Sequence, residues 1–144
     1  MESLYYAKAQ RRVLGSLLFL TLTLIRVDDF PQWLQVSQLV LAFIIGMGIF
    51  IEYKVDINEG YLTYQIELFH VTLYKKVVHY QQIKRLKFKR IGWAQKCVMI
   101  KNEKGFPIKL ANFNPNNIYQ DLIDFAAVYD IPITKTKDYL ILEK

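Results

Sequence analysis

Residues 33–51 read WLQVSQLVLAFIIGMGIFI, a run of 19 residues without a charged side chain. As a helix this run would be about 28 Å long, which is close to the thickness of the hydrocarbon core of a bilayer. Trp33 and Tyr53 stand at its two ends, where amphipathic aromatic side chains favour the membrane interface. The run therefore predicts a membrane-spanning helix over residues 33–52.

A second, shorter apolar segment precedes this run. Residues 13–25 read VLGSLLFLTLTLI, and a helix of that length is about 20 Å long, which is short for a span. Arg12 and Arg26 flank the segment and can extend their charged groups towards the two interfaces. The sequence predicts a second spanning helix over residues 13–27, with a re-entrant or tilted segment as the alternative. A cleaved signal peptide is not expected, because no small-residue cleavage site follows.

The short linker between the two segments would join them as an antiparallel hairpin, whose orientation follows from the flanking charges. Lys8, Arg11 and Arg12 precede the hairpin and Lys54 follows it, whereas the linker carries only Arg26. Cytoplasmic loops are enriched in Lys and Arg. The sequence thus predicts an integral protein of the cell membrane with both termini in the cytoplasm.

The chain after residue 53 alternates between apolar and polar residues. In residues 61–69, Leu62, Ile66 and Leu68 would face one side of a strand while Gln65 and Glu67 face the other. Turn signals at residues 58–60 and 102–105 separate this run from further alternating runs. Six or seven short strands in residues 54–113 predict a small sandwich or open barrel.

The period becomes helical after Asn114-Pro115, which is typical of a helix start. Ile118, Leu122 and Phe125 form an apolar stripe, so a helix is expected over residues 115–129. Residues 138–143 predict a last strand or a segment packed on the domain. The expected fold is an α+β membrane protein, with a transmembrane hairpin in residues 1–53 and a cytoplasmic β domain, closed by the C-terminal helix, in residues 54–144.

Three stretches of this domain carry a family resemblance. They are VDINEGYLTY (residues 55–64), KKVVHYQQIKRL (75–86) and GFPIKLANF (105–113), the last leading into the final helix. The order of hairpin and domain resembles that of bacterial small membrane proteins with a pleckstrin-homology-like (PH-like) domain. The resemblance implies a binding or assembly module. It does not imply recognition of phosphoinositides, because the first turn, Asn58-Glu59-Gly60, is acidic.

The basic residues of this domain form the main candidate site. The net charge is +6, and the whole excess lies in residues 54–144, because residues 1–53 carry four charges of each sign. On a strand, Arg85, Lys87 and Lys89 share one face. The predicted patch for anionic lipid or a partner comprises Lys75, Lys76, Lys84, Arg85, Lys87, Lys89, Arg90, Trp93 and Lys96. The alternative is a solvated strand face that discourages edge pairing.

Trp93 lies in a predicted turn beside Gly92. It is expected to dip into the membrane interface, to anchor a partner protein, or to fold back on the sheet. Nucleic acid is a less favoured partner of the basic residues, because a tether would place anionic lipid much closer.

No motif predicts catalysis, a metal site or a cofactor. Cys97 is the only cysteine, so an intrachain disulfide is impossible, and we expect it to be a buried apolar residue. His70 and His79 have no acidic cluster beside them and are expected to be structural. Asp121 and Asp124 are expected to face solvent on the helix.

These features predict a membrane-anchored module without catalytic activity. The first hypothesis is that it binds a partner protein or a second copy of itself at the cytoplasmic membrane face. The alternatives are a sensor of anionic lipid headgroups that uses the basic run at residues 84–90, and an accessory subunit of a membrane transport or secretion complex.

Overall fold

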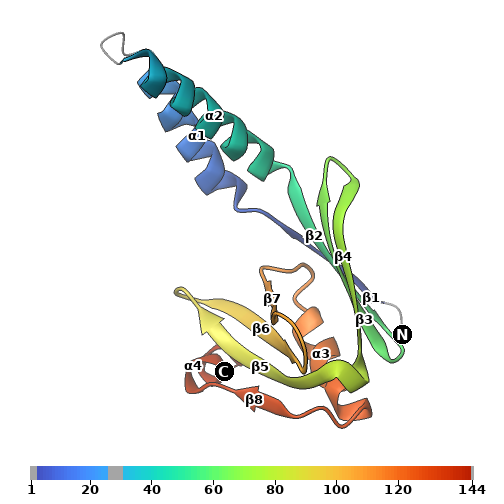
Figure 1. Ribbon diagram of the computed structural model, residues 1–144. Coiled ribbons are helices and arrows are strands. Elements are labelled where there is room, and N and C mark those ends of the chain that lie inside the picture. The colour runs from blue at the N-terminus through green and yellow to red at the C-terminus, as the bar shows by residue number, and fades with distance from the viewer. Residues whose placement is uncertain (1–2, 26–30, 144) are drawn as a thin grey trace.

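The computed structural model describes residues 3–25 and 31–143. These residues form an α+β fold with two four-stranded sheets and four α-helices (Figure 1). In chain order the elements are β1 (Ser3–Lys8), α1 (Arg11–Ile25), α2 (Gln32–Ile49), β2 (Ile51–Asn58), β3 (Tyr61–Leu68), β4 (Val71–His79), the 3₁₀ helix η1 (Tyr80–Gln82), β5 (Ile83–Ile91), β6 (Gln95–Asn102), β7 (Ile108–Ala111), α3 (Ile118–Val128), β8 (Ile133–Lys135) and α4 (Lys137–Glu143).

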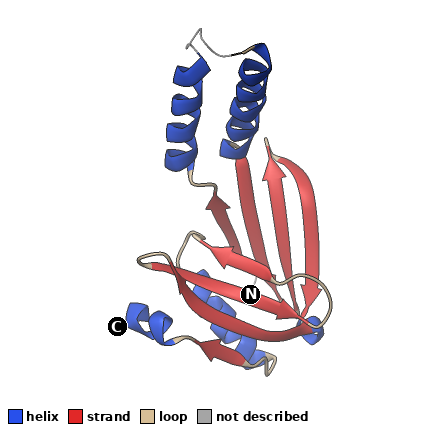
Figure 2. Ribbon diagram, turned by 60° about the vertical axis from the view of Figure 1, so that its left-hand side comes forward, coloured by secondary structure: helices blue, strands red, loops and turns tan. Residues whose placement is uncertain are grey.

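Helices α1 and α2 lie side by side and extend away from the two sheets (Figures 1 and 2). Within the described residues, α2 is the one helix that is long and apolar enough to cross a membrane. The 15 residues of α1 give it a length of about 22 Å, so its length does not support the second span expected over residues 13–27. Residues 26 and 27 of that expected span lie outside the described part of the chain. Helix α2 ends at Ile49, three residues before the expected end, because the chain pairs as β2 from Ile51 onward.

Strand β1 is the largest departure from the predicted organisation. It pairs antiparallel with β2 over its whole length, from Ser3 opposite Ile57 to Lys8 opposite Glu52. Tyr5 and Ala7 are each only 4% exposed and belong to the hydrophobic core. The helical hairpin is therefore inserted between two neighbouring strands of one sheet, and the boundary expected at residues 53 and 54 falls inside β2.

The two sheets enclose one core. The first sheet has the antiparallel order β1-β2-β3-β4, and the second has the order β7-β6-β5-β8, in which β8 runs parallel to β5. Val55 of the first sheet, Leu86 and Phe88 of the second, and Leu122 of α3 are all at most 1% exposed. The expected closure of the β domain by a C-terminal helix corresponds to α3, whose apolar stripe is buried in this core.

The C-terminal elements differ in detail from those expected. Helix α3 begins at Ile118, three residues after the expected start at residue 115, because the chain from Pro115 first forms turns in which the Ile118 and Tyr119 N–H groups bond to carbonyls three residues earlier. Residues 138–143 belong to helix α4, so the expected last strand is wrong there, and β8 supplies the final strand instead. The alternative of a packed segment is confirmed: Tyr139 is 1% exposed and its ring centroid lies 5.4 Å from that of Phe88.

Candidate functional site

The strand β5 places alternate basic side chains on the outer side of the second sheet. Leu86 and Phe88 are fully buried, so Arg85, Lys87 and Lys89 face the other way. Across the strands, Arg85 pairs with Lys101 of β6. Lys87 pairs with Met99, which in turn pairs with Lys109 of β7. The resulting outer basic face consists of Arg85, Lys87, Lys89, Lys101 and Lys109.

Lys84 lies at the border of this face because of an irregularity in the strand. The pairing shifts between Ile83 and Arg85, which leaves Lys84 unmatched in the register with β6. Lys84 and Arg85 are consequently both exposed between two buried residues, Ile83 and Leu86. The structure thus groups four of the predicted basic residues, and it adds Lys101 and Lys109, which the sequence did not identify.

The other predicted basic residues lie elsewhere. Arg90 and Lys96 pair with each other on the opposite side of the sheet from Lys89, and the Lys96 Nζ lies 5.8 Å from the centroid of the Tyr139 ring. Lys75 and Lys76 belong to β4 in the first sheet, where the Lys76 Nζ donates a hydrogen bond of 3.3 Å to the backbone carbonyl of Phe106. The single predicted patch is therefore divided among three places.

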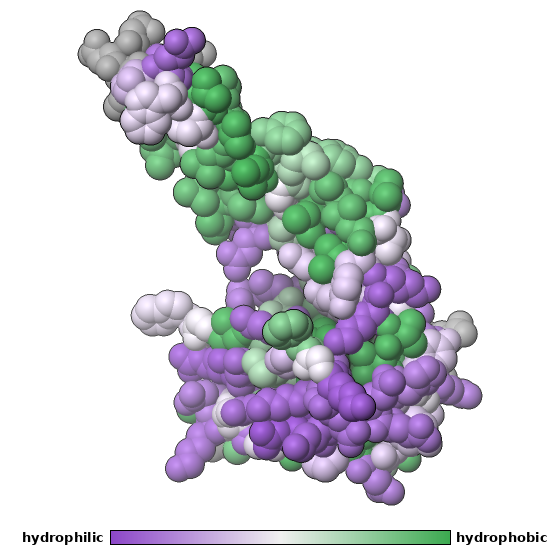
Figure 3. All heavy atoms as spheres, viewed as in Figure 1, coloured by the Kyte–Doolittle hydropathy of each residue, from purple (hydrophilic) through white to green (hydrophobic). Residues whose placement is uncertain are grey.

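The outer basic face has no acidic partner within the described residues. The ion pairs of the described residues join Lys8 and Arg11 to Glu52, Lys54 to Glu67, and Lys135 to Glu143. None of these pairs includes a cation of the outer basic face. Figure 3 shows a broad hydrophilic band over the part of the molecule that contains β5. The positive charge of the face is thus available to an external anion.

Four further residues singled out in the sequence have clear positions. Trp93 is 94% exposed in the turn between β5 and β6, so the expectation that it folds back on the sheet is wrong. Cys97 is fully buried, and burial raises the pKa of its thiol, which fits the expected role as a buried apolar residue. His79 occupies the cap position of η1, where its backbone N–H donates a hydrogen bond of 3.3 Å to the Gln82 side-chain oxygen, whereas His70 is exposed in the turn between β3 and β4. No group of three or more His, Cys, Asp or Glu side chains in the described chain is arranged to hold a metal ion.

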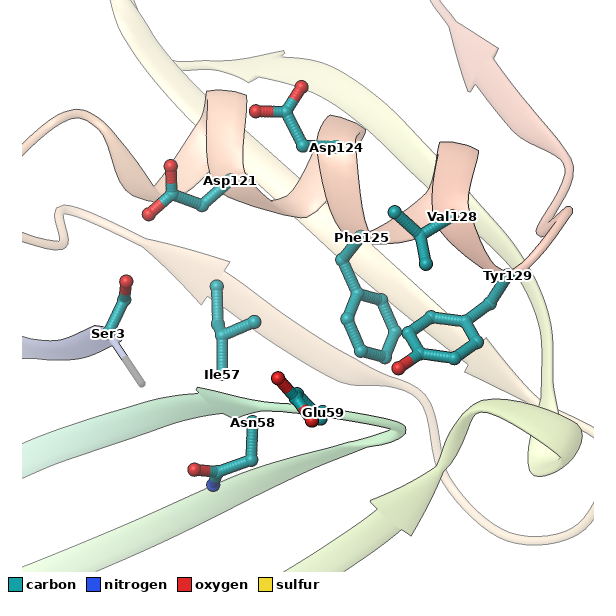
Figure 4. Close-up of a pocket in the computed structure, with 9 residues that line it drawn as sticks. All are labelled: Ser3, Ile57, Asn58, Glu59, Asp121, Asp124, Phe125, Val128 and Tyr129. Atoms are coloured by element: carbon teal, nitrogen blue, oxygen red, sulfur yellow. The ribbon is translucent and has the colours of Figure 1, made fainter. Parts of the chain in front are cut away.

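A cleft that the sequence did not reveal opens between the β2–β3 turn and α3 (Figure 4). Its volume is about 330 Å³. Figure 4 shows the Phe125 and Tyr129 rings extending from α3 towards the turn that carries Glu59. Apolar and acidic side chains dominate the lining: Ile57, Phe125, Val128 and Tyr129 are apolar or aromatic, and Glu59, Asp121 and Asp124 carry carboxylates.

Two of these carboxylates are held in place by neighbouring donors. The Tyr5 hydroxyl donates a hydrogen bond to Asp121, and the Gln120 side-chain amide donates one of 3.0 Å to Asp124. Burial and this contact with Asp121 raise the pKa of Tyr5 to about 12, so the hydroxyl remains a donor at neutral pH. Asp121 is half-buried and Asp124 is exposed, so the expectation that both face solvent is confirmed for Asp124 alone.

The cleft was missed because it joins residues from distant parts of the chain. The lining residues Ser3, Ile57 and Asp121 come from three distant segments, and no local pattern predicts that they meet. Comparison of the chain with protein-family models and with curated proteins finds no match.

Proposed function

We propose that this chain is a membrane-anchored binding module without catalytic activity, held by its helical hairpin. The exposed apolar surface of the hairpin carries this proposal. Helix α1 has no buried residue, and Ala42 is the one buried residue of α2. Phe19, Trp33 and Phe43 are each about 70% exposed. Soluble monomers rarely expose contiguous apolar patches larger than a few hundred Å², whereas acyl chains solvate such a surface without penalty.

The hydroxyl groups of the hairpin support the same environment. Each donates a hydrogen bond to a backbone carbonyl three or four residues earlier in its own helix, so none of them needs water. These residues are Ser16, Thr21, Thr23 and Ser37.

In this proposal α2 crosses the bilayer, and α1 lies alongside α2. Helix α2 is about 27 Å long, which is close to the hydrocarbon thickness, while Arg11 and Arg12 at the start of α1 extend into the headgroups. The cations at the base of the hairpin, including Lys8 and Lys54, favour a cytoplasmic location for the β domain.

The β domain supports a binding role of the PH-like kind. The antiparallel strands β1 to β7 form two sheets around one core and are followed by α3, although β1 precedes the helical hairpin whereas the resembling stretches all follow it. The cleft beside α3 suits a segment of a partner protein, because its apolar lining and its carboxylates match a sequence that combines apolar and cationic side chains.

Alkaline extraction of the full-length chain tests the anchor. Membranes that contain the chain are washed with sodium carbonate at high pH, which strips peripheral proteins and leaves embedded ones in the pellet. We expect the chain to remain in the pellet and to be released by detergent. Release into the carbonate supernatant would overturn the proposal, because it would place the hairpin against another protein.

A second candidate function is the recognition of anionic lipid headgroups by the outer basic face, which has no described acidic partner. Each Lys or Arg near an anionic surface contributes about 1 kcal/mol. In a hairpin-free version of the chain, with residues 10–50 replaced by Asn-Gly, changing Arg85, Lys87 and Lys89 to Glu is therefore expected to weaken binding to anionic vesicles by at least about 100-fold.

Co-sedimentation with anionic and neutral vesicles at two salt concentrations measures this effect. The matched control changes Lys75, Lys104 and Lys137 to Glu, which alters the net charge equally but leaves the outer basic face intact. Equal losses in both triple variants would point to a general effect of net charge. Absence of binding by the unmodified version would identify the face as a solvated surface.

A further inference from the structure

The turn between β3 and β4 has a sequence that its backbone does not favour. Leu68 pairs with Val71, so Phe69 and His70 form a two-residue turn. Both residues have positive φ angles, 50° for Phe69 and 67° for His70. Turns of this kind favour Asn and Gly, and a bulky residue with positive φ is unusual. The geometry of the turn therefore gives no reason for an exposed Phe at this position.

The end of this hairpin is an apolar surface. Three large apolar side chains there are 48–63% exposed: Phe50, Phe69 and Val71. We call these residues the apolar tip. Directly behind the tip, Glu52 pairs across the sheet with Glu67, and Lys8 and Arg11 contact Glu52. A charged row is thus followed, one residue further along the strands, by an apolar one.

The apolar tip is continuous with the helical hairpin. Phe50 is the residue that ends α2, and its ring stacks on the Phe69 ring with centroids 4.5 Å apart. Figures 1 and 2 both place the β3–β4 turn beside the C-terminal end of α2. In Figure 3 the hydrophobic surface extends from the helices onto this neighbouring part of the molecule.

We infer that the apolar tip inserts into the boundary between headgroups and acyl chains, as a membrane contact additional to the two helices. This inference rests on the proposed membrane anchor. A bilayer is the occupant that fits, because any membrane that surrounds the end of α2 at Phe50 also reaches Phe69, which touches it. The charged row behind the tip then lies at headgroup level, where the exposed side chains of Lys8 and Arg11 remain hydrated. The contact fixes the orientation of the β domain relative to the bilayer.

Tryptophan placed at single positions tests this inference in the full-length chain. Trp33 and Trp93 are first changed to Phe, and the chain is reconstituted into phosphatidylcholine vesicles with or without lipid brominated on its acyl chains, which quenches nearby tryptophan. Phe69→Trp reports on the tip, and Phe43→Trp, in the exposed middle of α2, reports on the anchor. Tyr61→Trp is the control, because Tyr61 begins β3 about 23 Å along the strand from Leu68.

We expect blue-shifted emission and loss of intensity with brominated lipid at positions 43 and 69, and neither at position 61. Quenching at position 43 without quenching at position 69 would overturn the inference and leave the anchor intact. Absence of quenching at position 43 would overturn the anchor, and the inference with it. A blue shift at position 69 that is not quenched but grows with protein concentration would assign the tip to a second copy of the chain.

A second variant separates the membrane contact from a structural role of Phe69. Changing Phe69 to Asn and His70 to Gly gives the turn a sequence suited to its backbone. We expect the β domain to unfold at the same or a higher temperature, while a tryptophan at Val71 loses quenching by brominated lipid. A lower unfolding temperature with unchanged quenching would show that Phe69 serves the fold through its stack on Phe50.

Discussion

Replacing residues 10–50 with Asn-Gly is expected to yield a soluble chain that folds cooperatively, whereas a fragment of residues 54–144 is expected not to fold. The structure brings the two cut ends together, because Lys8 pairs with Glu52 and the Ala9 backbone N–H donates to the Ile51 carbonyl at 3.4 Å. A two-residue Asn-Gly turn matches the twist of such a strand pair. The helical hairpin therefore replaces what would otherwise be a tight turn.

The fragment fails because it removes β1 and the first three residues of β2. Tyr5 and Ala7 leave the core, and Tyr5 also loses its contact with Asp121. Truncating a buried large aromatic side chain costs about 3–5 kcal/mol, against a total stability of about 5–15 kcal/mol for a domain. Losing a whole strand costs more and leaves β2 as an unpaired edge.

Thermal unfolding followed by circular dichroism measures the difference. Within the hairpin-free version, Tyr5→Ala is expected to lower the free energy of unfolding by about 3–5 kcal/mol. The neighbouring Tyr6→Ala, at a side chain that is 41% exposed, provides the matched control and is expected to change it little. A fragment of residues 54–144 with the same unfolding temperature as the hairpin-free version would show that β1 contributes nothing.

Changing Leu39 and Phe43 to Arg is expected to remove the full-length chain from the membrane fraction that resists alkaline extraction. Both residues are exposed on α2, at 56% and 69%, and they lie one turn apart near its middle. Insertion of an Arg at the centre of a membrane helix costs about 2.5–3.5 kcal/mol, so two cost roughly 6 kcal/mol. A position near the middle of the span limits how far the charge can reach towards either interface.

The matched control changes Leu140 and Ile141 of α4 to Arg. These side chains are also exposed, at 46% and 62%, but belong to the β domain. The control is expected to stay in the membrane pellet after alkaline extraction, and both variants are expected to retain the β domain, because neither pair belongs to its buried core. Retention of the α2 variant in the pellet would mean that acyl chains do not surround the hairpin.

The local patterns of the sequence predicted much of the structure. Alternation of apolar and polar residues located strands in residues 54–113, and the turn signal at residues 58–60 corresponds to the β2–β3 turn, in which Gly60 has a positive φ of 82°. The same alternation predicted that Arg85, Lys87 and Lys89 share a face. These features depend on neighbours within a few positions, and the period of a strand is therefore sufficient to predict them.

Tertiary contacts determine the conformation of the short segments. Strand β1 has six residues and places only Tyr5 and Ala7 in the core, which is too brief an alternation to recognise alone, and its partner β2 lies more than 40 positions away in the sequence. Residues 138–143 are apolar at several consecutive positions, which favoured the prediction of a strand. In the structure they form a helix, from which Tyr139 packs against Phe88. In such segments local preference is weak, and packing determines the conformation.

The sequence by itself determined which segments are apolar enough to form the hairpin, which residues alternate in the strands, and which cations share a face of β5. Only the tertiary structure decided that β1 precedes the hairpin in the same sheet, that Lys101 and Lys109 join the outer basic face, and that Asp121 meets Tyr5. The physical reason is that hydrophobic periodicity is a property of neighbouring residues, whereas sheet register and the closing of a cleft depend on how distant segments pack in one core.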